Sequence, residues 1–182
     1  DGKIFFCTLP NGDRIETERQ GMEVAPLKVT VRNARRLPDA FDDRCFALRS
    51  WHTALSYDDF FVHEKVQGVI FPESEALLKE TLGAAVVLPF DYIVRSVKKY
   101  NEGVRMSGDS QQAVKGVATG VHADYTLNGG PRRLEQLATA PKTNDVRERS
   151  LSVEELQRAR KGRWMIVNLW RNIRAEPLEK TP

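Results

Sequence analysis

The chain has 182 residues, of which 41% are hydrophobic and 29% are charged. This composition is typical of a globular domain and excludes disordered, fibrous and membrane-embedded chains. The 28 Lys and Arg residues exceed the 25 Asp and Glu residues by only three charges, which disfavours a nucleic acid as partner. A chain of this length buries roughly 70% of its unfolded surface, so we predict one domain over residues 1–182 that needs no disulfide or metal for stability.

The two cysteines and the apolar runs predict where the protein resides. Cys7 and Cys45 form no paired-spacing motif and are typical of free thiols in a reducing compartment. No apolar run approaches the roughly 20 residues that span a bilayer, and the apolar stretch within residues 1–7 is too short to be expected as a signal peptide. We therefore expect a cytoplasmic protein without a membrane partner. The chain has no initiator Met and ends at Pro182 just after a strand-like segment, which predicts a longer gene product.

The N-terminal third contains mostly strand signals. Residues 3–8 and 27–31 have strand character, and the residues at 10–13 (Pro-Asn-Gly-Asp) are typical of a tight turn. Residues 45–48 are a further short strand candidate. Ser56, followed by acidic residues, is typical of the N-cap of a short helix.

The middle of the chain combines one clear helix with two predicted strands. Residues 73–82 have helical spacing, with Pro72 at the start and Gly83 at the end. The β-branched and aromatic residues of 84–97 predict a strand, and 117–127 return to strand character. The polar residues 98–116 between them predict a flexible loop.

The last part begins with a second polar loop, residues 138–150. Ser152 and Glu155 then form a capping box, which predicts a helix to Lys161 that Gly162 ends. Residues 163–173 alternate as a strand does. Taken together, these elements predict a mainly β fold with flanking helices.

One pair of residues has the pattern of a metal site. Of the three histidines, His52 and His63 are more typical of surface or boundary positions. His122 and Asp124 lie two apart in a predicted strand, so both side chains would leave the same face of the sheet. An imidazole and a carboxylate are two of the three ligands in the facial triad of non-haem Fe(II) oxygenases. The alternative is a His and an Asp that form a hydrogen bond at a strand end.

Several segments together resemble one enzyme family more specifically than this pair does. The chain looks like the hydroxylase/desaturase family of fungal and bacterial secondary metabolism, which includes relatives of the cephalosporin 7α-hydroxylase/methoxylase component. The resemblance covers most of the chain from about residue 27 onward. The segments that carry it are residues 27–33, 71–80, 90–95, 121–126 and 166–173.

The resemblance implies a non-haem Fe(II) oxygenase that uses 2-oxoglutarate and O2 on a double-stranded β-helix, or jelly-roll, scaffold whose C-terminal strands the chain lacks. His122 and Asp124 match the first two iron ligands, and the second histidine would lie beyond Pro182. The implied reaction is hydroxylation, desaturation or oxidative cyclisation of a small molecule. Arg171 is the candidate residue for binding the cofactor, because its planar guanidinium suits a carboxylate. The candidate residues for binding the substrate are Tyr125, Asn168 and Trp170.

Two alternatives stay open at this point. One is an iron oxygenase without 2-oxoglutarate, in which the substrate itself binds the metal. The other is a non-catalytic jelly-roll binding module. The expected partners are a small-molecule substrate and O2, and the exposed edge strands of a jelly roll would be covered in a homodimer.

Overall fold

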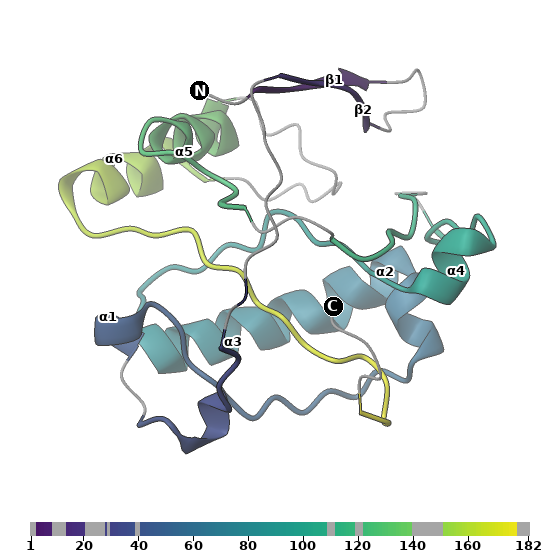
Figure 1. The fold of residues 1–182 in the computed structure, drawn as a ribbon. Coiled ribbons are helices and arrows are strands. Elements are labelled where there is room, and N and C mark those ends of the chain that lie inside the picture. The colour runs from purple at the N-terminus through teal and green to yellow at the C-terminus, as the bar shows by residue number, and fades with distance from the viewer. Residues whose placement is uncertain are drawn as a thin grey trace. The chain divides into compact units, whose positions relative to one another are not determined.

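The computed structural model describes residues 3–8, 14–20, 28, 30–38, 41–108, 112–118, 122–139 and 151–177. The chain divides into two compact units, Asp1–His52 and Thr53–Pro182. Figure 1 shows the elements of each unit in chain order.

The first unit begins with two antiparallel strands. Strand β1 (Lys3–Thr8) pairs with β2 (Arg14–Gln20), with a register shift between Phe5 and Phe6. The predicted first strand is confirmed. The second strand was predicted at 27–31, which is wrong for the described residues 28, 30 and 31, because β1 pairs with the segment nearest along the chain. The predicted turn at 10–13 lies outside the described residues.

Two short helices follow in this unit. The 3-10 helix η1 (Ala34–Arg36) begins after Asn33, whose side-chain oxygen accepts a hydrogen bond of 3.1 Å from the amide of Arg35. Helix α1 (Phe41–Arg44) ends at Cys45, where the backbone has a φ of 60°. The strand predicted at 45–48 is therefore wrong: a left-handed residue opens the segment, and no described strand pairs with it.

A nearly continuous helical run forms the centre of the second unit (Figure 1). It consists of the 3-10 helix η2 (Asp58–Phe61), α2 (His63–Lys65), the π-helix η3 (Val66–Ile70) and α3 (Phe71–Leu82). The predicted helix with Pro72 at its start and Gly83 at its end is confirmed, since Gly83 adopts a φ of 62°.

The start of this run departs from the predicted capping by Ser56. The carboxylate of Asp59 accepts hydrogen bonds from the Ser56 amide (2.9 Å) and the Ser56 hydroxyl (2.7 Å). Asp59 also forms an ion pair with Lys65. The hydrogen bonds from Lys65 and then Ser56 lower the pKa of Asp59 from 3.8 to about 2. No side chain therefore caps η2 at its start; Ser56 donates to Asp59 instead of accepting from the helix.

Segments on both sides of α3 complete the core of this unit. Isolated bridges join Val62 to Ser107, Arg95 to Lys115 and Arg105 to Ala113. Helix α4 (Val97–Asn101) covers the start of the predicted flexible loop, and within that loop Met106 and Val114 are each only 2% exposed. The loop prediction is therefore wrong. The sequence did not reveal these buried positions, because single apolar residues between polar ones give no periodic signal. The other buried apolar residues of this core are Phe60, Phe61, Val66, Ile70, Phe71 and Val94.

Two helices form a pair near the C-terminus, α5 (Gly129–Thr139) and α6 (Val153–Lys161). Leu137 and Leu156 are buried, and Arg160 forms an ion pair of 2.6 Å with Glu135. The predicted capping box of α6 is confirmed. Helix α5 was not predicted, although proline is tolerated in a first helical turn. Most of the predicted loop 138–150 lies outside the described residues.

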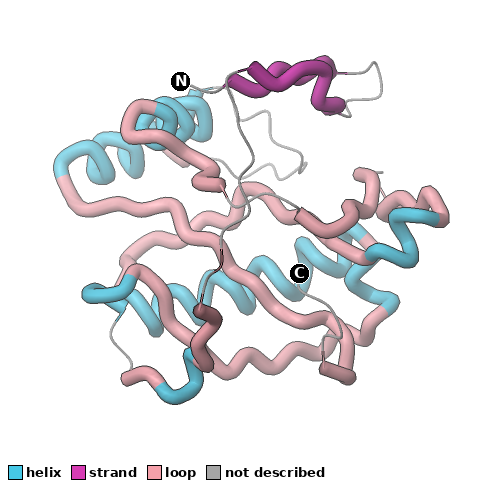
Figure 2. The backbone as a smooth tube through the Cα atoms, in the orientation of Figure 1, coloured by secondary structure: helices cyan, strands magenta, loops and turns pink. Residues whose placement is uncertain are grey.

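The predicted mainly β jelly roll is wrong. In the described ranges, the strands are β1 and β2, which form one two-stranded sheet, and the other regular elements are helices, coloured cyan in Figure 2. The described parts of the strands predicted at 84–97, 117–127 and 163–173 contain no strand: Arg95 forms an isolated bridge and Val97 begins α4. β-branched and alternating residues favour an extended backbone, but only a partner strand makes that backbone a sheet. Among the helices that the structure describes, none is long and apolar enough to cross a bilayer.

Candidate functional site

The helix pair brings together the two segments that carry the predicted site. Residues 122–128 lead into α5, and residues 163–173 follow α6. Gly130 is buried, and a Cβ atom at this position would lie 3.4 Å from the Trp164 ring. The start of α5 therefore lies against the residues that follow α6, as in an antiparallel pair of helices. Residues 122–128 and 163–173 consequently meet at the end of the pair where α5 begins and α6 ends.

His122, Asp124 and Asn168 form a polar cluster where these segments meet. The His122 Nε2 atom lies 3.2 Å from Asp124 Oδ1, and the two side chains are 64% and 45% exposed. The Asn168 side-chain amide donates a hydrogen bond of 2.7 Å to Asp124 Oδ2. The two carboxylate oxygens thus have different partners. His122 and Asp124 lie close together, but their segment is not the strand from which this proximity was predicted.

The separation of His122 and Asp124 fits two ligands of one metal ion. Metal–ligand bonds of about 2.1 Å at right angles place two donor atoms about 3.0 Å apart. A hydrogen bond from the imidazole to the carboxylate also fits 3.2 Å. The described ranges contain no cluster of three or more His, Cys, Asp or Glu residues that could hold a metal. The pair therefore supplies two donors of different chemistry, and its role as ligand stays a prediction.

The other predicted site residues are less closely associated with this pair. Tyr125 follows Asp124 and is 36% exposed, whereas Trp170 is 65% exposed. Arg171 lies with its guanidinium carbon 5.4 Å from the centre of the Phe60 ring, at the core of the unit. Burial lowers the pKa of Arg171 from its ordinary value, and the charge of Glu73 opposes this shift. These surroundings are those of a residue that packs against η2 and α3; its role toward a cofactor stays a prediction.

The most buried polar side chain was missed by the sequence reasoning. His63 is 1% exposed, and its Nδ1 atom lies 2.6 Å from the Tyr92 hydroxyl oxygen. The prediction of a surface or boundary position is therefore wrong for His63, whereas His52 is exposed as predicted. The preceding apolar residues, Phe60 to Val62, were the one signal for burial.

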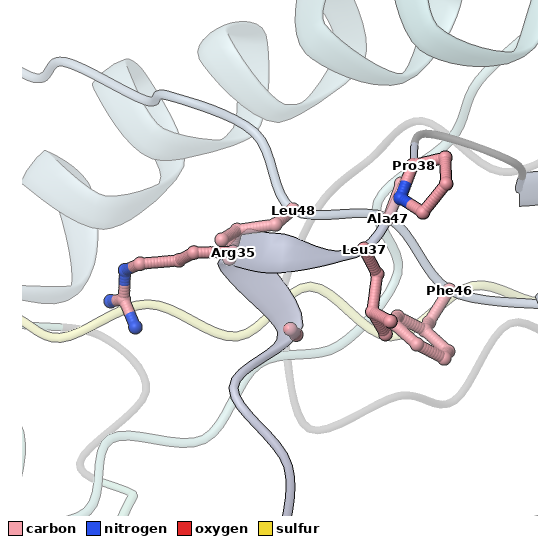
Figure 3. Close-up of a pocket in the computed structure, with 7 residues that line it drawn as sticks. Arg35, Leu37, Pro38, Phe46, Ala47 and Leu48 are labelled. Atoms are coloured by element: carbon pink, nitrogen blue, oxygen red, sulfur yellow. The ribbon is translucent and has the colours of Figure 1, made fainter.

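The first unit contains a hollow of about 170 Å³, shown in Figure 3. Ligand sites measure roughly 300–1,000 Å³, so this hollow is too small for a drug-sized ligand. In Figure 3 the Arg35 side chain extends away from the Leu37 and Phe46 side chains. The hollow is lined by Ala34, Arg35, Leu37, Pro38, Phe46, Ala47 and Leu48.

A family model described as "Oxidoreductase/YMDC permease-like domain" matches residues 3–182. By class, the chain is therefore an oxidoreductase. It belongs to the oxidoreductase/YMDC permease-like family, because the match covers nearly all of its length.

Individual relatives are distant. The chain is 27% identical over 95% of its length to an "uncharacterized protein in dcmA 3'region" of Methylophilus leisingeri, of which it covers 82%. It is 25% identical over 92% of its length to the "alpha-ketoglutarate-dependent dioxygenase tstK" of Talaromyces stipitatus, of which it covers 55%. It is 32% identical over 62% of its length to the "hydroxylase/desaturase CTB9" of Cercospora beticola, of which it covers 32%. No solved structure matches the chain.

These comparisons agree with the broader part of the predicted resemblance. The relatives include proteins named as dioxygenase and as hydroxylase/desaturase, and the description of the family names an oxidoreductase. The chain spans about half the length of tstK and a third of CTB9. The narrower relationship to the cephalosporin 7α-hydroxylase/methoxylase component stays a prediction.

Proposed function

We propose that this chain supplies two metal ligands of a non-haem Fe(II), 2-oxoglutarate-dependent oxygenase. The enzyme would hydroxylate, desaturate or oxidatively cyclise a small molecule of secondary metabolism, with O2 as its second partner. The observation that carries the proposal is the 3.2 Å approach of His122 Nε2 to Asp124 Oδ1. The name of tstK, a dioxygenase that depends on alpha-ketoglutarate, supports the choice of co-substrate.

His122 and Asp124 would hold the metal through a neutral nitrogen and a charged oxygen. When bound, Fe(II) supplies the activation of O2 that couples oxidation of 2-oxoglutarate to oxidation of the substrate. For hydroxylation, one O2 and one 2-oxoglutarate give the hydroxylated product, succinate and CO2. Asp124 would also neutralise part of the metal charge. The exposure of both side chains leaves room for further ligands at this site.

Two exposed aromatic residues would contact the substrate. Tyr125 and Trp170 present aromatic surface to solvent on the two segments that meet at Asp124. Large aromatic side chains combine apolar area with few rotatable bonds, so they suit contact with a small organic molecule. Arg171 packs against Phe60, and we therefore infer that it supports the segment 163–173 from the core side.

Anaerobic titration with Fe(II) tests the proposal directly. The wild-type protein should bind Fe(II), and His122→Ala should weaken this binding at least 10-fold because one of the two proposed donors is removed. His52→Ala is the matched control, since His52 is an exposed histidine of the other unit and should bind as the wild type does. Equal binding by the wild type and by His122→Ala would contradict the proposal.

A second measurement separates the two remaining alternatives. If 2-oxoglutarate is the co-substrate, succinate should form in proportion to oxidised product. An iron oxygenase without 2-oxoglutarate would form product and no succinate. A non-catalytic binding module would take up no iron, because the 3.2 Å contact would then be only a hydrogen bond between His122 and Asp124.

A further inference from the structure

We propose that Asn168 is a positioning residue that orients the Asp124 carboxylate, rather than a residue that binds the substrate. The inference rests on the proposed function, because it concerns the same metal site. Its evidence is the 2.7 Å hydrogen bond from the Asn168 amide to Asp124 Oδ2, which joins residues 44 positions apart in the chain.

The hydrogen bond gives the two carboxylate oxygens different roles. Oδ2 accepts from Asn168, and Oδ1 is the oxygen that lies 3.2 Å from His122 Nε2. A carboxylate on an exposed side chain rotates about its terminal torsion, which is broad and roughly two-fold. A bond to one oxygen restricts that rotation and keeps the other oxygen directed at the imidazole. The carboxylate is therefore presented to a metal through Oδ1.

Asparagine suits this role chemically. Its side-chain NH2 group donates to the carboxylate without adding a charge, so the negative charge of Asp124 remains available to a cation. An aspartate of the same shape at position 168 would have no such donor and would repel Asp124. Hydrogen bonds to ligating carboxylates affect metal affinity by roughly 10- to 100-fold.

The surrounding fold holds the two segments in contact. The Trp164 ring lies against Gly130, where no side chain intervenes. Arg160 and Glu135 form an ion pair across α5 and α6, close to the beginning of the segment that carries Asn168. Asn168 is exposed, so its contribution lies in this contact with Asp124 rather than in core packing.

Anaerobic Co(II) titration, followed by visible absorption, tests the inference independently of turnover. Asn168→Ala should lower Co(II) affinity about 10-fold because it removes the donor to Asp124 Oδ2. Asn168→Leu, which keeps a similar volume but has no donor, should lower the affinity as much. Asn172→Ala is the matched control: the Asn172 amide donates to the Glu176 carbonyl oxygen (2.8 Å) in the same segment. This variant should bind Co(II) as the wild type does.

The outcomes distinguish this inference from the proposed function. If the wild type binds Co(II) through His122 but both Asn168 variants bind it equally well, the positioning role is overturned and the metal site stands. If His122→Ala binds as the wild type does, the proposed function itself fails. Circular dichroism melting should give similar midpoints for Asn168→Ala and Asn172→Ala. A loss of Co(II) binding that only parallels a loss of folded protein would also overturn the positioning role.

Discussion

The imidazole of His63 and the phenol of Tyr92 are joined inside the core of the second unit. His63 Nδ1 lies 2.6 Å from the Tyr92 hydroxyl oxygen, and the two rings stack with centroids 5.7 Å apart. His63 Nε2 has no hydrogen-bond partner in the described part of the chain. The contact with Tyr92 is thus the single side-chain hydrogen bond that satisfies this buried imidazole, and it links α2 to residues beyond α3.

The first prediction concerns that bond. Tyr92→Phe should lower the free energy of unfolding by about 1–3 kcal/mol, because it leaves the buried His63 Nδ1 atom without its partner. Urea denaturation followed by circular dichroism measures this change. Tyr100→Phe, at a tyrosine that is 55% exposed, is the control and should change stability little. Equal effects of the two substitutions would show that the His63 contact contributes nothing measurable.

Two glycines should respond to alanine with opposite signs. Gly83 ends α3 with a φ of 62°, so Gly83→Ala should cost about 1 kcal/mol of stability through backbone strain. Gly68 lies within η3, and a Cβ atom there would meet nothing within 4 Å. Gly68→Ala should therefore stabilise the protein by up to about 1 kcal/mol. Thermal melting compares the two variants, and a Gly83→Ala protein as stable as Gly68→Ala would contradict the assigned cap.

The capping box of α6 gives a third prediction. Ser152 Oγ accepts from the Glu155 amide (3.1 Å), and the Glu155 carboxylate accepts from the Ser152 amide (2.9 Å). Ser152→Ala should lower stability by about 1 kcal/mol, because an N-terminal amide of the helix loses its acceptor. Glu154→Gln, in the same first turn but outside the box, serves as control. Denaturant midpoints that fall equally in both variants would argue against the cap.

The lowered pKa of Asp59 predicts that the stability of the protein depends on pH in the acidic range. Hydrogen bonds from Lys65 and Ser56 lower its pKa from 3.8 to about 2 in the folded protein. A carboxyl group whose pKa is lowered on folding adds stability that is complete above its unfolded pKa and is lost as the pH falls through its folded pKa. Between about pH 4 and pH 2, Asp59→Asn should therefore lose less stability than the wild type does.

Urea denaturation from pH 6 to pH 2 measures this difference. Asp58→Asn is the control, because the Asp58 side chain is 86% exposed and its Oδ1 atom lies 3.8 Å from Lys99 Nζ, a longer separation than that of a hydrogen bond. Parallel curves for the wild type and Asp59→Asn across this range would refute the assigned role of Asp59.

Local signals in the sequence were sufficient for some elements. Helix α3 has a proline in its first turn and a glycine where the left-handed backbone is required. Helix α6 contains both members of its capping box within four residues. The His122–Asp124 pair was also predictable, because two residues so close along the chain approach each other in many backbone conformations.

The remaining features depend on segments that are distant in the chain. Whether the extended segments form a sheet depends on which partner the fold places beside each backbone, so the alternation of residues 163–173 predicted a strand that the structure does not contain. The burial of His63 beside Tyr92 and the contact of Asn168 with Asp124 likewise join residues 29 and 44 positions apart. Residue type and spacing identified the donors of the candidate site, but only tertiary packing decided which groups surround and orient them.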